Sequence, residues 1–218
     1  MWMKSFITLF LSLSSISQAQ IISEYGIKFG TVSSKQIFER GRANNLVWDS
    51  YLDRNLSRRL GPQIVLFAQL LNARHLNLQC EVNYLQKGAE EEIYPTFVGP
   101  DGNYITGEPF KIETSQFDYI TFSVLAQPKV SIEQIELYIL AGPSLNILIG
   151  NREWLFREAD FLTPSVVIGG GFEFKKLFEF PLLIEIRYSP DLKYIFENEY
   201  IKSKFRIWQL LFGAKLNR

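Results

Sequence analysis

Cysteine and histidine are almost missing from this sequence of 218 residues, which has one of each, Cys80 and His75. A single cysteine cannot form an intramolecular disulfide, and one cysteine with one histidine falls short of the usual ligand sets of zinc. Hydrolysis by a serine nucleophile usually needs a histidine base, and His75 lies in a short predicted turn. We therefore predict no catalytic residues, no metal site, no cofactor and no enzymatic activity.

An excess of charge of one sign is also missing, because 23 Lys and Arg residues balance 23 Asp and Glu residues. No basic footprint favours nucleic acid as a partner. Aromatic residues, in contrast, are abundant at 15%, with 18 Phe and 10 Tyr. This enrichment is typical of β-strands and of the belts that anchor proteins at membrane interfaces.

No run of 18 apolar residues follows the N-terminal region, which excludes a helical membrane protein. The N-terminus itself resembles an export signal: Lys4 precedes a short apolar stretch, Phe6–Leu13, and Ser17 and Ala19 suit a cleavage site. We predict a signal peptide over residues 1–19; a buried N-terminal helix is the alternative. An exported chain without apolar helices can enter a membrane only as a closed barrel, because lipid cannot satisfy an open sheet edge.

Eight segments alternate between apolar and more polar residues with a period of two. In the clearest one, Leu76, Leu78 and Val82 share one face, while Asn77 and Glu81 occupy the other. The mostly apolar face of each segment carries no charge, and most segments approach the length of a tilted membrane strand, ~9–11 residues. The segments cover roughly residues 25–30, 63–70, 76–84, 119–127, 135–146, 166–174, 182–189 and 207–216.

The connections between these segments alternate between long and short. The long ones cover about 32–60, 88–116, 150–163 and 190–203, and the short ones 71–75, 128–134 and 175–180. Outer-membrane barrels have this asymmetry, with short periplasmic turns and longer outer loops. The pattern predicts an all-β fold: an eight-stranded antiparallel up-and-down transmembrane β-barrel over residues 20–218. Residues 35–60 have some helical character, so we expect a short helix in the first outer loop.

Several stretches resemble the PorT-like outer-membrane β-barrel family of Gram-negative bacteria. They include the opening Tyr25–Gly30 (YGIKFG), the run Leu76–Gly88 (LNLQCEVNYLQKG), Leu137–Pro143 (LYILAGP), and Glu185–Ser189 (EIRYS). The resemblance extends over essentially the whole mature chain in the family's order. It implies a location in the outer membrane, insertion by the barrel assembly machinery, and a link to secretion or gliding machinery, although most relatives have no assigned role.

Charged residues on the polar faces are predicted to point into the barrel. Eight strands leave an interior just wide enough to be filled by side chains, and buried charges must pair there. We expect an ion-pair network that plugs the barrel and leaves no open pore. A narrow ion or proton path, or acid–base work by paired glutamates, is the alternative. The predicted interior charges are Lys28, Glu81, Glu136, Glu173, Glu185, Arg187 and Lys215.

Two further groups of residues allow two interpretations each. Charge runs at Glu90–Glu92 and at Arg54, Arg58 and Arg59 fall in predicted outer loops, where they are either solvated or bind a partner. Aromatic residues near the strand ends are either interfacial anchors or ordinary packing residues. These aromatic residues are Trp154, Phe156, Tyr188, Tyr194 and Trp208.

The sequence favours a monomeric barrel in the outer membrane with a structural or interaction role. Its expected contacts are outer-membrane lipid, the barrel assembly machinery, and another envelope or secretion protein bound through the outer loops. The main alternative is a soluble periplasmic carrier resembling lipocalins, and a lipid-modifying barrel enzyme is a third. A carrier would turn its apolar face inward, whereas a membrane barrel turns it outward.

Overall fold

The computed structural model describes residues 23–42, 56–93, 96–98, 104–106, 111–151, 159–175 and 180–216. The predicted signal peptide lies outside these residues, as do Arg54, Trp154 and Phe156. Within the described part of the chain, no helix has both the length and the apolar character needed to cross a membrane.

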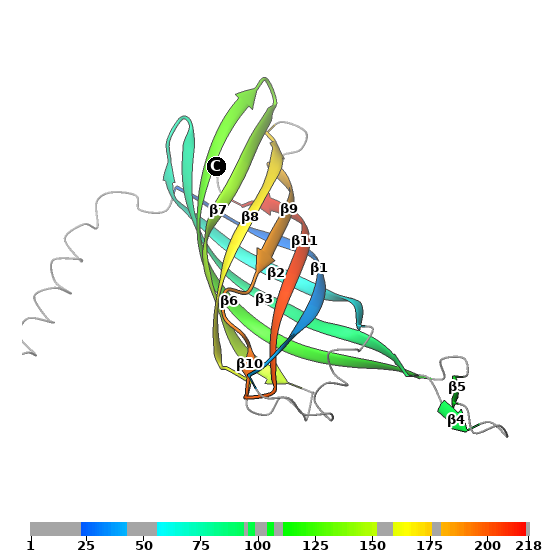
Figure 1. Ribbon diagram of the computed structural model, residues 1–218. Coiled ribbons are helices and arrows are strands. Elements are labelled where there is room, and N and C mark those ends of the chain that lie inside the picture. The colour runs from blue at the N-terminus through cyan, green and yellow to red at the C-terminus, as the bar shows by residue number, and fades with distance from the viewer. Residues whose placement is uncertain are drawn as a thin grey trace, which may run out of the picture.

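Eight antiparallel strands close into a ring in the order β1-β2-β3-β6-β7-β8-β9-β11 (Figure 1). The ring closes because β1 pairs with β11 along fifteen partner positions, from Gly26 opposite Lys215 to Arg40 opposite Ile201. This confirms the predicted all-β, eight-stranded up-and-down barrel. The bounds are β1 (Glu24–Arg40), β2 (Leu56–Asn72), β3 (Leu76–Ile93), β6 (Lys111–Ile132), β7 (Ile135–Asn151), β8 (Leu162–Phe174), β9 (Leu182–Pro190) and β11 (Ile201–Lys215).

Three short strands lie at the end of the barrel that carries the long connections. β4 (Thr96–Val98) and β5 (Tyr104–Thr106) form a hairpin, and β10 (Phe196–Glu197) pairs with β11. β3 and β6 remain paired as far as Ile93 opposite Lys111. They therefore form an arm that projects away from the barrel and carries the β4–β5 hairpin at its tip (Figure 1).

Several strands are longer than predicted at the end with the long connections. β1 continues to Arg40 and β2 starts at Leu56, so the outer parts of the predicted first loop are strand; the predicted helix falls largely on residues 43–55, outside the described residues. β6 reaches 22 residues, about twice the expected length. In these extensions the inward side chains stay buried, as at Ser34, Lys87 and Ser203, but polar residues also occupy outward positions, so the apolar–polar alternation fades while backbone pairing continues.

The alternation places apolar side chains on the outside of the barrel. Phe29, Ile139 and Ile186 are 52%, 65% and 57% exposed, while their neighbours Lys28 and Arg187 are buried. This direction is the one expected for a wall that faces hydrocarbon and the reverse of that expected for a lipocalin-like carrier.

The interior is less polar than the sequence predicted, because two apolar clusters share it with the charges. One contains Phe117, Tyr119 and Phe205 together with Ile195 of the β9–β10 connection. The other contains Phe67, Leu125, Leu140 and Leu183. The phenylalanine and leucine positions have inward parity on their strands, so the barrel is filled by packing as well as by ion pairs.

Candidate functional site

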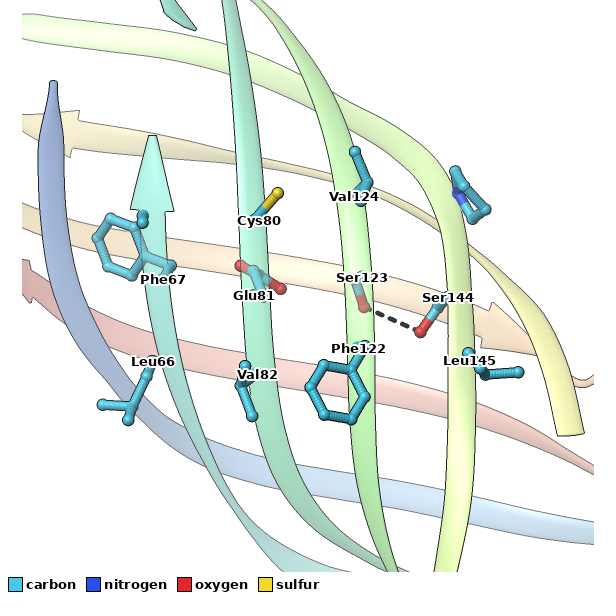
Figure 2. A pocket seen from close by; sticks show the side chains of 12 residues that line it. Leu66, Phe67, Cys80, Glu81, Val82, Phe122, Ser123, Val124, Ser144 and Leu145 are labelled. Atoms are coloured by element: carbon cyan, nitrogen blue, oxygen red, sulfur yellow. Dashed lines mark hydrogen bonds between the residues drawn. The ribbon is translucent and has the colours of Figure 1, made fainter. Parts of the chain in front are cut away.

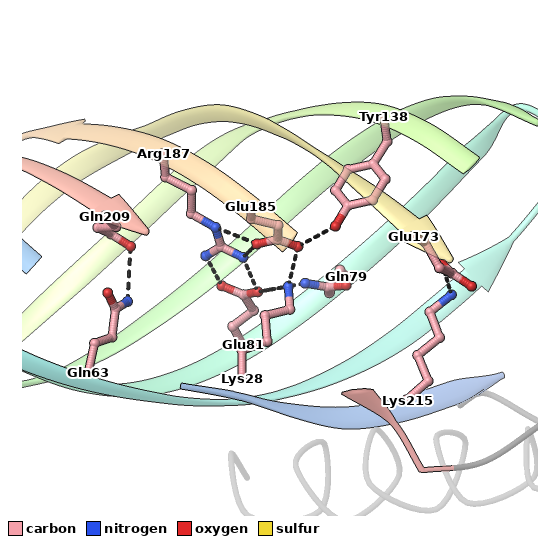
Figure 3. Close-up of polar contacts among 10 residues, drawn as sticks. All are labelled: Lys28, Gln63, Gln79, Glu81, Tyr138, Glu173, Glu185, Arg187, Gln209 and Lys215. Atoms are coloured by element: carbon pink, nitrogen blue, oxygen red, sulfur yellow. Dashed lines mark hydrogen bonds and ion pairs between the residues drawn. The ribbon is translucent and has the colours of Figure 1, made fainter. Parts of the chain in front are cut away.

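Four charged side chains from three strands meet in the middle of the barrel (Figure 3). Arg187 on β9 donates to both carboxylate oxygens of Glu81 on β3, with Nη1–Oε2 at 2.6 Å and Nη2–Oε1 at 2.7 Å. It also donates through Nε to Glu185 Oε2 at 2.8 Å. Lys28 on β1 completes the group, with Nζ 2.6 Å from Glu185 Oε1 and 3.1 Å from Glu81 Oε1. We call these four residues the central cluster.

Neutral residues complete the hydrogen bonding of the central cluster. The Tyr138 hydroxyl on β7 donates to Glu185 Oε1 at 2.7 Å, and Gln79 Nε2 donates to Glu81 Oε1 at 2.6 Å. The Lys28 ammonium lies 4.6 Å from the ring centroid of Phe67. Two cations and two anions thus balance, which is the condition under which buried charges are tolerated.

Glycines on neighbouring strands make room for these side chains. A Cβ at Gly213, opposite Lys28 on β11, would lie 2.6 Å from Lys28 Cγ. A Cβ at Gly171 would lie 2.8 Å from Glu185 Cγ and 2.9 Å from the Tyr138 hydroxyl oxygen. Both contacts are too short for any side chain, so glycine is needed where the backbone passes the central cluster.

The other three predicted interior residues are buried but belong to two separate groups nearer the short turns. Lys215 Nζ lies 2.6 Å from both Glu173 and Glu24. Glu136 pairs with Lys175 at 2.6 Å and with Lys129 at 3.4 Å. The structure therefore brings four of the seven predicted residues together in the central cluster. Glu173 pairs with Lys215 instead, and Glu136 lies apart from both groups.

A further buried ion pair, which the sequence analysis missed, lies on the side of the long connections. Lys87 Nζ is 2.7 Å from Asp191 Oδ1, and Lys87 also lies 4.7 Å from the ring centroid of Tyr119. Asp191 accepts from Asn146 Nδ2 at 3.2 Å and from the Phe205 backbone N–H at 3.1 Å. Strand parity could have found this pair, because Lys87 follows Glu81, and Asp191 follows Arg187, by an even number of residues.

The side chains around the central cluster leave little free space in the lumen. The gap on its short-turn side, between Gln79, Glu136 and Glu185, has no room for a water molecule. Glu185 and Glu173, the paired glutamates of the acid–base alternative, are each held by a different cation, Lys28 and Lys215. Among the described residues no three His, Cys, Asp or Glu side chains are grouped as a metal site would require, and His75 is exposed in the β2–β3 turn.

The outer wall carries a shallow apolar groove of about 590 Å³ across β2, β3, β6 and β7 (Figure 2). Leu66, Val82 and Phe122 line it, with Cys80 among them. The neighbouring Ser123 and Ser144 hydroxyls are 2.8 Å apart and buried. Cys80 therefore sits on a wall suited to acyl chains, where a thiol behaves as a small apolar side chain.

An aromatic pair lies on the outer wall toward the long connections. The Tyr188 and Trp208 rings on β9 and β11 are 5.0 Å apart between centroids, and Trp208 is 47% exposed. Aromatic side chains of this kind gather at membrane–water interfaces. They mark the height at which the apolar band of β11 gives way to the basic positions Arg206, Lys204 and Lys202.

Comparison with known proteins gives one family and several similar folds. The family model described as outer membrane protein beta-barrel domain matches residues 17–197. No curated protein matches the sequence. Among solved structures, neisserial surface protein A is 12% identical, with 89% of this chain and 97% of that chain covered and a TM-score of 0.49.

Two other solved structures are similar at the same level. The attachment invasion locus protein Ail of Yersinia pestis, in complex with the heparin analogue sucrose octasulfate, is 14% identical, with 88% of this chain and 98% of that chain covered and a TM-score of 0.41. The outer membrane protease OmpT of Escherichia coli is 8% identical, with coverage of 88% and 95% and a TM-score of 0.48. Neither similarity assigns an activity to this chain.

Proposed function

The chain belongs to the outer membrane protein beta-barrel domain family and is a small β-barrel of the outer membrane, and on this premise we propose that it is a plugged, non-enzymatic anchor acting through its long connections. Residues 1–19 are removed as a signal peptide in this proposal. The remaining chain is a monomer that contacts lipid along its wall and is inserted by the barrel assembly machinery. The long connections face the outside of the cell, and the short turns face the periplasm.

The observation that carries the absence of a pore is the central cluster. Arg187, Glu81, Glu185 and Lys28 bridge β1, β3 and β9 across the lumen with contacts of 2.6–3.1 Å. An ion passing this level would have to separate buried pairs, each of which is costly to break. Purified protein in planar bilayers is therefore expected to give no conductance steps of porin size. Regular steps from the wild-type protein would overturn the plug.

The projecting β3–β6 arm is the feature that favours an interaction role. Its strands stay paired to Ile93 and Lys111 and carry acidic side chains such as Glu91 and Glu113, which lie directly opposite each other. An arm of this length adds nothing to the closure of the barrel, and extended loops on rigid scaffolds commonly carry binding functions.

Replacing residues 94–110 with an Asn-Gly turn tests this role, because Ile93 and Lys111 already face each other as hairpin ends. We expect the barrel to keep its heat-modifiable migration on gels, while chemical cross-links to neighbouring envelope proteins in whole cells disappear. A matched control shortens residues 152–158 in the β7–β8 connection and is expected to keep the cross-links. Unchanged cross-linking without the arm's tip would contradict a role for the arm.

Within this family, the motifs shared with PorT-like barrels favour an accessory of a secretion machine as the finer role. Cells lacking the protein are then expected to deliver less of their exported protein to the surface. Normal delivery would exclude the accessory role and favour a simple envelope anchor.

A further inference from the structure

Two basic residues lie directly opposite each other on the outside of the barrel. Lys35 on β1 is the cross-strand partner of Arg206 on β11, and both side chains are exposed. They share outward parity with Trp208, which lies one outward position nearer the middle of the barrel. On β2, Arg59 is the cross-strand partner of Ser34 on β1. The strands are antiparallel, so Arg58 lies beside Lys35 and adds a third basic side chain to the pair. We call Lys35, Arg58 and Arg206 the basic rim.

The basic rim places like charges side by side on neighbouring strands. Like charges directly opposite each other weaken a strand pair. The buried cations Lys28, Lys87 and Arg187 all form ion pairs inside the barrel, and Lys204 on the outside pairs with Glu39. Within the part of the chain that the structure describes, no ion pair joins Lys35, Arg58 or Arg206 to a carboxylate.

The height of the basic rim identifies the anion that would complete it. Two residues along a strand advance about 6.6 Å, so Arg206 lies one such step beyond the aromatic pair that marks the interface. Lipid phosphates lie at this level, just outside the hydrocarbon. At the opposite end of the same two strands the outward positions are Tyr25 and Leu216, which carry no charge. On these two strands the outward cations are therefore confined to the end that carries the long connections.

We infer that the basic rim binds the phosphate groups of a glycolipid of the outer leaflet, the lipopolysaccharide class of lipid. Arginine guanidinium groups bind phosphate oxygens in pairs, and lysine adds a point charge between them. The lipid phosphates would offset the repulsion between Lys35 and Arg206. This inference rests on the proposed orientation, in which the long connections face outside, and goes beyond the proposed function by naming a lipid ligand.

The test uses full-length mature protein in nanodiscs that contain phosphatidylcholine with either bisphosphorylated or dephosphorylated lipid A. Native mass spectrometry after release from the nanodisc counts the lipid A molecules that stay bound. The wild-type protein is expected to retain the phosphorylated form about tenfold more than the dephosphorylated form. The double variant Lys35→Gln/Arg206→Gln is expected to lose this preference, whereas Lys35→Arg is expected to keep it.

The matched control, Arg74→Gln/Lys193→Gln, removes one arginine and one lysine that are exposed elsewhere and is expected to behave like the wild type. Heat-modifiable gel migration verifies that every variant is folded. Equal retention of the two lipid A forms by the wild type, or equal retention by wild type and rim variant, would overturn the inference and favour a protein as the occupant of the rim.

Orientation is measured separately, so that its failure is distinguishable from failure of lipid binding. Lys193→Cys and Arg74→Cys variants are treated in whole cells with a membrane-impermeant maleimide. Labelling of Cys at position 193 alone is expected. Labelling at position 74 alone would reverse the orientation and remove the outer-leaflet lipid as the ligand, even if the nanodisc experiment showed phosphate binding.

Discussion

Arg187 and Arg206 are the same residue type on neighbouring strands, yet their surroundings are opposite. Arg187 points into the lumen and contacts two carboxylates, while Arg206 points outward and faces another cation, Lys35. Inside the barrel water is excluded, so every charge must be paired by the chain itself. At the rim, solvent and lipid headgroups are available, so a cation can remain open to an external partner. We therefore propose a structural role for the lumen and a binding role for the rim.

The largest expected effect comes from breaking the central cluster. Arg187→Met leaves Glu81 and Glu185 buried with Lys28 as the only remaining cation of the cluster. Loss of one member of a buried ion network costs about 3–5 kcal/mol, which we expect as a lower free energy of unfolding in urea titrations of the lipid-refolded barrel. The control Arg206→Met changes an exposed side chain and is expected to stay within about 0.5 kcal/mol of wild type. Similar losses from both variants would remove the contrast between lumen and rim.

A smaller effect is expected at the buried pair nearer the long connections. Lys87→Met removes the cation beside Asp191, but Asn146 and the Phe205 N–H still donate to that carboxylate. A loss of about 2–3 kcal/mol in the same unfolding titration is expected, since an incompletely satisfied buried group remains. The double variant Lys87→Met/Asp191→Asn removes both charges and is expected to recover part of the loss. No recovery would mean that packing, rather than charge, dominates at this position.

Adjacent glycines on β8 offer a comparison between the two faces of the wall. A Cβ at Gly171 would collide with the Glu185 side chain and the Tyr138 hydroxyl, whereas a Cβ at Gly170 would meet only Tyr138 O at 3.2 Å and a methyl of Ile139 at 4.0 Å. Gly171→Ala is therefore expected to destabilise the barrel by about 1–3 kcal/mol through overpacking, and Gly170→Ala by less. Equal effects on thermal unfolding would show that the lumen side is not tightly packed.

The period-two pattern was enough to predict the architecture of the barrel, but not which interior charged residues contact one another. It predicted eight strands and the inward direction of Lys28 and Arg187, because parity alone decides which face a strand residue occupies. It could not predict that Glu136 lies apart from Glu185, since the tilt and stagger of strands set the relative heights of residues distant in sequence. It missed Lys87 and Asp191 because the predicted strands stop before these residues. Polar residues occupy both faces there, so the alternation no longer marks a strand.

The smallest expected effect is at the rim, where Glu39 lies beyond the apolar band. Hydrogen bonds from Lys204, at 2.5 Å, and from the Tyr194 hydroxyl, at 2.6 Å, lower the pKa of the Glu39 carboxyl from its ordinary value of 4.5. A lowered folded-state pKa contributes stability that is present above the unfolded-state pKa and lost as the pH falls through the folded-state pKa.

Because the Glu39 side chain is 40% exposed, solvent screens this contribution, and Glu39→Gln is expected to change stability near pH 7 by only a fraction of the Arg187→Met effect. The difference between wild type and Glu39→Gln is expected to shrink as the pH falls below the ordinary carboxyl pKa of 4.5 and to vanish once the pH is below the lowered folded-state pKa. Unfolding titrations of both proteins across this acid range measure it. A difference that persists unchanged in acid would show that Glu39 acts through packing and not through its charge.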